Sequence, residues 1–259
     1  MKAEQLPEIG GAYQIDRGQI EDFHRDGHLK LKSVLAPEEL VTYREYLKEA
    51  VERGGAKRNC NVWCLDNAAR QFVLSTRLAR IAAELLDVEA VRLLRDEPYF
   101  KNAGDHNTPW HQDGYFIPLD SNIVTLWIPL TDLDSDMAPM SYATGSHKAG
   151  FMGLCGPDDE SMSRFEQKVR NRGFAIHNYG SFNAGDIAAH SGKTLHSSRK
   201  NRSSRMREVL IIIYFADGAR VIDTSTLPPG GPPLEVLLPG VRPGDLANGP
   251  LTPLVYSRS

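Results

Sequence analysis

The chain has 259 residues, 41% of them hydrophobic, and a net charge of −3, which is enough sequence for one large β-rich domain or two small ones. Acidic and basic residues are interspersed and form no basic stripe, so we expect no nucleic-acid partner. No window approaches the roughly 20 apolar residues of a membrane span, so we expect a soluble, cytoplasmic protein.

Helical patterns are concentrated in the first third of the chain. Pro37 opens a segment, PEELVTYREYLKEAVERGG, whose apolar residues share one face of a helix that Gly54 and Gly55 would end. A second segment, TRLARIAAELLD, repeats apolar residues at helical spacing from Thr76. Both segments therefore predict amphipathic helices.

The cysteines do not form a metal-binding pattern. Cys60 and Cys64 make a C-x3-C without a second ligand pair nearby, and three cysteines cannot all pair with one another. We interpret them as reduced structural thiols rather than as a zinc site.

From residue 90 the pattern changes to short β-like runs separated by turn residues. These runs are AVRLLRDEPYFK, IVTLWIPL, FAIHNYGSFN, GDIAAHSG and REVLIIIYF. Several short strands after leading helices favour a closed or sandwiched sheet over alternating βαβ units. Residues 228–253 are rich in Pro and Gly and predict an extended strap over the surface.

The pattern H-x-D-G occurs twice, and the two copies differ in context. Residues i and i+2 of a strand share a face, so a His and an Asp at that spacing can bind one cation. His111 and Asp113 follow a β-like region and precede apolar residues, which fits a strand-end ligand pair facing a barrel interior. His24 and Asp26 lie in a polar segment between two short elements, so we interpret that copy as a turn.

A facial triad needs a third, neutral donor, for which His196 is the preferred candidate. Arg207 follows eleven residues later and opens a strongly apolar strand. If the two strands are neighbours, its guanidinium enters the same cavity and can bind a carboxylate; otherwise Arg207 caps the sheet edge in solvent. His190 is the rival ligand, because a regular strand would give it the same orientation as His196, but Gly192 would break that strand.

These residues resemble the phytanoyl-CoA dioxygenase family of iron(II)- and 2-oxoglutarate-dependent oxygenases. FHRDGHLKLKSVLAPEEL is similar to the family's N-terminal signature, and TPWHQD, VTLWIPL, APM…TGSH and HSSRKNRSSRMR match family blocks in order and spacing. The resemblance implies a mainly β fold, a cupin-like double-stranded β-helix or jelly roll with flanking N-terminal α-helices. It implies a single domain over residues 1–259, with helical support in 1–90, the jelly-roll core in 91–220 and an extended tail in 221–259.

The resemblance also assigns the central residues of the site. It makes His111, Asp113 and His196 the catalytic residues that bind Fe(II), and Arg207 the partner of the distal carboxylate of the cosubstrate 2-oxoglutarate. O2 is the other cosubstrate. Relatives that halogenate replace the carboxylate at Asp113, so halogenation is not expected here.

Three further positions bear on the cosubstrate. Ser198 and Trp127 match positions that contact it in relatives, although a turn hydroxyl and an ordinary core tryptophan are the alternatives. Glu97 falls near where some relatives have an uncharged residue lining the cosubstrate site. An acidic group there would oppose a dianion, so either that wall is rearranged or Glu97 points outward.

The implied reaction is hydroxylation of an unactivated C–H bond of a small metabolite or natural-product intermediate, with release of succinate and CO2. Desaturation, epimerisation or cyclisation with the same cofactors, a metal-binding jelly roll that is not an oxygenase, and a non-catalytic binding module remain alternatives. Side chains beside the metal motif offer an apolar wall or polar contacts to a substrate, or serve only as packing and solvated loop. They are Trp110, Tyr115 and Phe116, and Asp105, His106 and Asn107.

Overall fold

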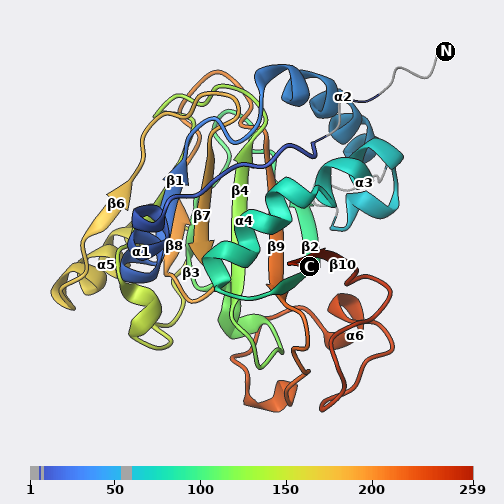
Figure 1. Ribbon diagram of the computed structural model, residues 1–259. Helices are drawn as coiled ribbons and strands as arrows, with labels where there is room; N and C mark the ends of the chain where they lie inside the picture. Colours follow the sequence, from blue (N-terminus) through green and yellow to red (C-terminus); the bar gives the residue numbers. More distant parts are fainter. Residues whose placement is uncertain (1–5, 7–8, 54–59, 259) are drawn as a thin grey trace.

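The computed structural model describes residue 6, residues 9–53 and residues 60–258 (Figure 1). Its helices are α1 (Arg17–Asp26), α2 (Pro37–Arg53), α3 (Asn67–Val73), α4 (Thr76–Leu86), α5 (Asp159–Asn171) and α6 (Leu234–Leu237). Short 3-10 helices are η1 (Val62–Cys64), η2 (Asp113–Phe116), η3 (Ser146–Lys148) and η4 (Thr224–Thr226). The strands are β1 (His28–Leu31), β2 (Ala90–Pro98), β3 (Thr108–His111), β4 (Ile123–Pro129), β5 (Met140–Ala143), β6 (Ile176–Asn178), β7 (Ile187–Ser191), β8 (His196–Ser198), β9 (Val209–Ala216) and β10 (Leu254–Ser257).

The local sequence patterns correspond to elements of the structure. Both predicted helices are confirmed as α2, which begins at Pro37, and α4. The predicted stop at Gly54 and Gly55 lies outside the described residues. Each of the five predicted β-like runs contains a strand, namely β2, β4, β6, β7 and β9.

The described strands form two antiparallel sheets. One is six-stranded, in the order β1-β7-β4-β9-β2-β10, and the other is four-stranded, in the order β3-β8-β5-β6. In Figure 1 helix α4 lies across one face of the six-stranded sheet. This arrangement confirms a jelly-roll core with flanking N-terminal helices. In the described part of the chain, no helix is both long and apolar enough to span a bilayer.

The apolar runs of β4 and β9 are continuous because both faces of their sheet are covered. On β4, Leu126 and its alternate neighbours belong to the core cluster that also contains the helical residues, whereas Thr125 and Trp127 line a cavity on the opposite face. On β9, Ile212 and Ile213 divide in the same way. Strand alternation therefore decides which side chains reach the site.

Strand β2 contains an irregularity that changes which residues face inward. Its register with β9 shifts between Leu93 and Arg95, as at a β-bulge. Leu93 packs in the core cluster with the helices, whereas Arg95, Glu97 and Tyr99 line the cavity. A bulge re-aims the side chains beyond it, so Glu97 points into the cavity and not outward.

The tail is more structured than its Pro- and Gly-rich composition predicts. Within it, α6 contributes Leu237 to a buried cluster, and β10 pairs with β2 and becomes the edge strand of the six-stranded sheet. Gly230, Gly231 and Pro232 line the cavity. The tail therefore covers a sheet edge and closes part of the site.

The first H-x-D-G copy lies at the junction of α1 and β1. His24 is in the helix and its Nε2 is 2.9 Å from the carbonyl oxygen of Leu85, while Asp26 is the last helical residue. Gly27 has a left-handed backbone with φ of 83°, and its carbonyl accepts hydrogen bonds from the backbone N–H of Ser191 and from the hydroxyl of Thr194. The chain therefore turns at Gly27, as predicted for this copy, but His24 and Asp26 themselves are helical and not part of a turn.

Gly27→Ala is expected to lower the free energy of unfolding by about 2–4 kcal/mol, because an alanine there is strained and crowded. A Cβ would overlap the His147 ring and lie 2.5 Å from Thr194 Oγ1. Gly104 is the matched control, since its φ is 80° but a Cβ there meets nothing within 4 Å. Gly104→Ala should cost only about 1 kcal/mol, the backbone part of the effect. Urea denaturation of both variants tests this, and equal losses would contradict it.

Candidate metal centre and cavity

His111, Asp113 and His196 are brought together by the pairing of two short strands. In the antiparallel pair of β3 and β8, His111 lies directly opposite His196, and Asp113 follows β3 at the start of η2. One ligand atom from each of the three residues lies within 4.8 Å of the others. Among the described residues, this is the group of three His, Cys, Asp or Glu side chains that could hold a metal ion.

Backbone carbonyls orient both imidazoles. His111 Nδ1 is 2.7 Å from the oxygen of Pro109, and His196 Nδ1 is 2.9 Å from the oxygen of Thr194. A carbonyl only accepts, so each Nδ1 carries the proton and donates it. Each Nε2 is then left with the lone pair that a metal ligand needs.

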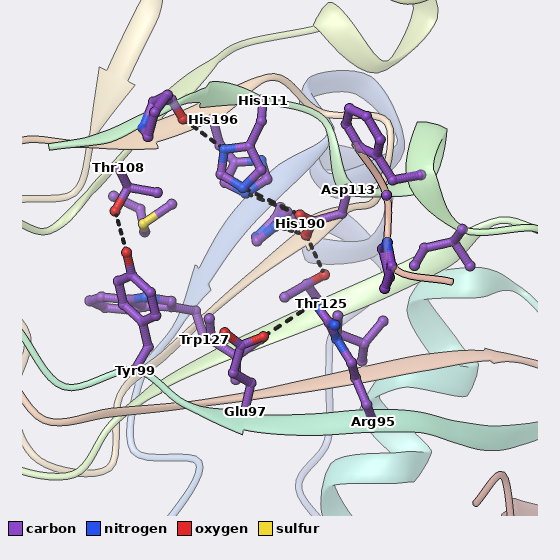
Figure 2. Close-up of a pocket in the computed structure, with 18 of the residues that line it drawn as sticks. Arg95, Glu97, Tyr99, Thr108, His111, Asp113, Thr125, Trp127, His190 and His196 are labelled. Atoms are coloured by element: carbon purple, nitrogen blue, oxygen red, sulfur yellow. Dashed lines mark hydrogen bonds and ion pairs between the residues drawn. The ribbon is translucent and has the colours of Figure 1, made fainter. Parts of the chain in front are cut away.

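The two oxygens of Asp113 have different neighbours (Figure 2). Oδ1 lies 3.4 Å from His111 Nε2 and 3.8 Å from His196 Nε2. Oδ2 accepts a hydrogen bond from Thr125 Oγ1 at 3.1 Å and lies 3.4 Å from His190 Nε2. Thr125 and His190 therefore fix the carboxylate through Oδ2, and Oδ1 is left directed to His111 and His196.

The electrostatics favour a charged Asp113 carboxylate beside a neutral His196 imidazole. Burial alone would raise the pKa of Asp113, but the adjacent His196, His111 and His190 hold that pKa well below its usual value. Burial, together with neighbouring His111 and His190, lowers the pKa of His196 well below its usual value. Two neutral imidazoles and one carboxylate are the donor set of the facial triad that binds non-heme iron(II). The residues therefore fit a divalent transition metal.

The triad opens into a cavity of about 570 Å³ between the two sheets. Apolar side chains from several elements line it, among them Phe116, Ile117, Leu154 and Ile213. Arg95 and Glu97 are charged groups in the same wall. The cavity is large enough for a small organic molecule beside the metal position.

Arg207 is fully buried and lies against two side chains that line this cavity, Tyr99 and Trp127. Its guanidinium carbon lies 5.3 Å from the centroid of the Tyr99 ring and 5.6 Å from that of Trp127. Nη1 donates to the oxygen of Ala138 at 2.5 Å and to Ser198 Oγ at 3.3 Å. Nε and Nη2 have no hydrogen-bond partner among the described residues. Burial lowers the pKa of Arg207 to about 10, so it remains a cation at neutral pH.

Nε and Nη2 form one edge of the planar guanidinium, and that edge matches the two oxygens of a carboxylate. A buried cation with two unpaired donors is costly unless an anion binds there. Arg207 is thus a buried side chain, and the alternative of a solvent-exposed edge cap is wrong.

A network of hydroxyls and a second cation surrounds Ser198. Lys101 Nζ donates to Ser198 Oγ at 2.9 Å and to Thr108 Oγ1 at 3.1 Å. Tyr99 OH lies 2.9 Å from the same Thr108 oxygen. Both Ser198 and Lys101 are buried, so Ser198 is a network member and not a solvated turn hydroxyl. Two buried cations, Lys101 and Arg207, thus meet at Ser198, next to Tyr99 and Thr108 of the cavity wall.

Trp127 and His190 also line the cavity. Trp127 lines the cavity, and its Nε1 has no hydrogen-bond partner among the described residues. His190 and His196 are on separate strands of different sheets, β7 and β8, yet their ring centroids are 4.2 Å apart. His190 reaches Asp113 Oδ2, the oxygen that faces away from the other two histidines.

The structure decides two alternatives that the sequence left open. The condition that the two strands are neighbours is not met, because β8, which carries His196, and β9, which begins two residues after Arg207, belong to different sheets. Arg207 instead reaches Ser198 across the space between the sheets. Of the expected apolar wall, Phe116 lines the cavity, whereas Trp110 is buried in a separate cluster with Met152.

The polar loop before the metal motif has a structural role at Asn107, whose amide donates to Asp159 and to the oxygen of Pro157.

The sequence analysis did not identify four residues in or next to the cavity wall: Thr125, Lys101, Thr108 and Arg95. A polar Thr125 two residues before Trp127 in an apolar strand was a usable signal, because both must share a face. For Lys101 and Arg95 no local pattern distinguishes a buried cation from an exposed one.

Comparisons with known proteins agree with this geometry. The family profile for phytanoyl-CoA dioxygenase matches residues 23–209. No curated protein matches the sequence significantly.

Solved structures show the same fold. The non-heme α-ketoglutarate-dependent carbocyclase SnoK from nogalamycin biosynthesis aligns with a TM-score of 0.77 and 21% identity, covering 95% of this chain and 100% of its own. The epimerase SnoN, solved with Fe3+, α-ketoglutarate and nogalamycin RO, aligns with a TM-score of 0.70 and 21% identity, covering 93% and 100%. EctD from S. alaskensis, solved with 2-oxoglutarate and 5-hydroxyectoine, aligns with a TM-score of 0.67 and 17% identity, covering 93% of each chain.

Proposed function

The chain belongs to the phytanoyl-CoA dioxygenase family, and from this membership we propose that it is an iron(II)- and 2-oxoglutarate-dependent hydroxylase. Its substrate is a small metabolite or natural-product intermediate with an unactivated C–H bond, and the coproducts are succinate and CO2. The observation that carries the proposal is the His-Asp-His group in the cavity, together with the buried Arg207, whose Nε and Nη2 have no hydrogen-bond partner in the described part of the chain.

His111 and His196 would bind iron(II) through Nε2, and Asp113 through its carboxylate. Bound iron(II) supplies the oxidising power by activating O2 together with the 2-oxo acid. With only these three protein ligands, the metal would keep open positions for its cosubstrates. Thr125 and His190 keep the Asp113 carboxylate oriented and charged, which preserves the negative charge that the cation requires.

Arg207 would bind the distal carboxylate of 2-oxoglutarate through Nε and Nη2. Lys101 lies close by, joined to Arg207 through Ser198, and adds a second positive charge for the dianion. Ser198 and Thr108 hold these groups in position, and Trp127 forms the adjoining wall. This division leaves the opposite part of the cavity to the substrate.

The apolar walls would exclude water from the reacting centre and hold the substrate against the metal. Phe116 and Leu154, which both follow the H-x-D motif in the sequence, line the cavity, and Gly231 of the tail lies against Phe116. We include in the proposal a single domain over residues 1–259 and a cytoplasmic location. Product analysis separates hydroxylation from desaturation, epimerisation and cyclisation, for which the same cofactors suffice.

The iron(II) protein is expected to convert 2-oxoglutarate to succinate in air, slowly alone and faster when a metabolite screen supplies the substrate. Succinate is quantified by mass spectrometry, with zinc-loaded protein as the control because zinc has no accessible redox change. Iron-dependent succinate formation that a screened metabolite stimulates is the supporting result. No succinate above the zinc control with any metabolite would favour a jelly-roll protein that is not an oxygenase.

A further inference from the structure

The loop from Gly150 to Cys155, between η3 and α5, forms part of the cavity wall. Its last two residues, Leu154 and Cys155, line the cavity. Leu154 is nevertheless 53% exposed to solvent. A side chain that belongs both to the cavity wall and to the surface lies where the cavity opens. We therefore call residues 150–155 the mouth loop.

Gln112, the middle residue of the H-x-D motif, ties the mouth loop to the metal centre. It is fully buried, and strand alternation turns its side chain away from the cavity that the two metal ligands beside it line. Its Nε2 donates to the oxygen of Gly150 at 3.1 Å and to that of Lys193, in the turn between β7 and β8, at 2.7 Å. Its Oε1 accepts from the backbone N–H of Met152 at 2.8 Å. One amide thus joins the metal motif to two other segments.

The backbone of the mouth loop carries this anchoring on to Leu154. Gly150 and Gly153 have left-handed backbone with φ of 76° and 90°, which glycine adopts without steric cost. Between them, the Met152 side chain is buried in an apolar cluster and its carbonyl accepts from Lys168 Nζ at 3.1 Å. Leu154 follows only two residues later, so the anchors at Met152 determine where Leu154 lies over the cavity.

The mouth of the cavity is apolar and aromatic. Phe116, just after the metal motif, lines the cavity as Leu154 does. Phe151 of the mouth loop is partly exposed, and its ring centroid lies 5.1 Å from that of Tyr115 and 6.1 Å from that of Phe116. A ligand with an apolar surface would remove these side chains from water, which is favourable, whereas a heavily hydroxylated one would lose its own hydration there.

We propose that the mouth loop recognises the substrate, with Leu154 and Phe116 in contact with an apolar carbon skeleton at the entrance of the cavity. Gln112 is the positioning residue that fixes this loop, and with it the substrate, relative to the metal. The inference rests on the proposed function, because it assigns the substrate side of the same cavity.

Cyclohexanol and myo-inositol test this recognition, because both contain a six-membered carbon ring and only myo-inositol carries a hydroxyl on every carbon. Each is titrated into the anaerobic iron(II) protein saturated with 2-oxoglutarate. Binding is followed by the iron-induced relaxation of the ring protons, which reports proximity to the metal and needs no turnover. The parent protein is expected to bind cyclohexanol about tenfold or more tightly than myo-inositol.

Leu154→Ser should weaken cyclohexanol binding about fivefold, because serine removes apolar surface that would cover the probe. Leu65→Ser is the matched control, since Leu65 is also 53% exposed but lies outside the cavity lining. It should leave the affinity for cyclohexanol unchanged.

Gln112→Met keeps the length of the side chain but removes its three hydrogen bonds to the backbone. With the mouth loop released, cyclohexanol should bind about tenfold more weakly. The relaxation of its protons at saturating probe should also fall, because the bound ring is no longer held close to the iron. A purely structural role for Gln112 would lower the free energy of unfolding but leave the relaxation at saturation unchanged.

The inference is overturned if the parent does not prefer cyclohexanol, if Leu154→Ser binds it as the parent does, or if folded Gln112→Met keeps both affinity and relaxation. The metal-to-ligand charge-transfer band of the 2-oxoglutarate complex checks that each variant is folded and loaded. Should Gln112→Met not fold, the pair of leucine variants still decides the recognition. Failure of the parent to form the band would count against the proposed function instead. Saturation-transfer NMR on the metal-free protein then measures the same cyclohexanol affinities, with the same deciding outcomes for Leu154.

Discussion

Replacing His196 by alanine is expected to abolish iron(II) binding and iron-dependent turnover while leaving the fold largely intact. His196 supplies one of three ligand atoms that lie within 4.8 Å of one another, and no described side chain stands ready to replace it at Asp113 Oδ1. The loss of affinity should exceed the roughly 10- to 100-fold that removal of a supporting residue costs. His111→Ala should behave in the same way. Equilibrium dialysis against iron(II), with circular dichroism for the fold, provides the measurement.

Two other histidines serve as comparison variants for this experiment. His190→Ala removes a neighbour of Asp113 Oδ2 and should weaken iron binding by about 10- to 100-fold, less than the loss of a ligand. His24→Ala affects only the contact between α1 and the end of α4, so iron binding should be unchanged. Activity lost with His24 but kept without His111 would transfer the metal site to the first H-x-D-G copy. Equal and complete losses for His190 and His196 would make His190 a ligand.

Arg207→Ala is expected to weaken 2-oxoglutarate binding about a hundredfold or more, provided that ~3 kcal/mol of interaction is lost. A carboxylate on the Nε and Nη2 edge accepts two charge-assisted hydrogen bonds, each worth about 1.5–3 kcal/mol. Arg207→Lys keeps the charge but not the planar edge, so its loss should be smaller than that of alanine. Titration of the anaerobic iron(II) protein with 2-oxoglutarate, followed by the charge-transfer band of the chelate, measures both.

Arg205 offers a matched control for this prediction. It lies two residues before Arg207, but its guanidinium pairs with Asp134 and its side chain is 54% exposed. Arg205→Ala should therefore leave 2-oxoglutarate binding unchanged. If Arg207→Ala binds 2-oxoglutarate as tightly as the parent, the unpaired edge is not a cosubstrate site and the proposed function loses its main support.

Several features of the molecule could be read from local sequence alone, because they depend on periodicity over a few residues. Apolar spacing of 3.6 predicts α2 and α4, and short apolar runs predict the strands of the core. Spacing along the chain also singled out His111, Asp113, His196 and Arg207, once the family blocks were considered together. The structure brings the first three together and buries the fourth against Ser198, two residues after His196.

Other features were decided only by the tertiary structure, because they depend on which strands pair and in what register. Strand pairing put β8 and β9 in different sheets, which local pattern cannot specify, and it brought His190 back to Asp113 from a third strand. A single register shift after Leu93 turned Arg95 and Glu97 into the cavity. Side-chain direction in a strand has a period of two, so one inserted residue reverses the face of everything beyond it, and the linear sequence does not mark where that residue lies.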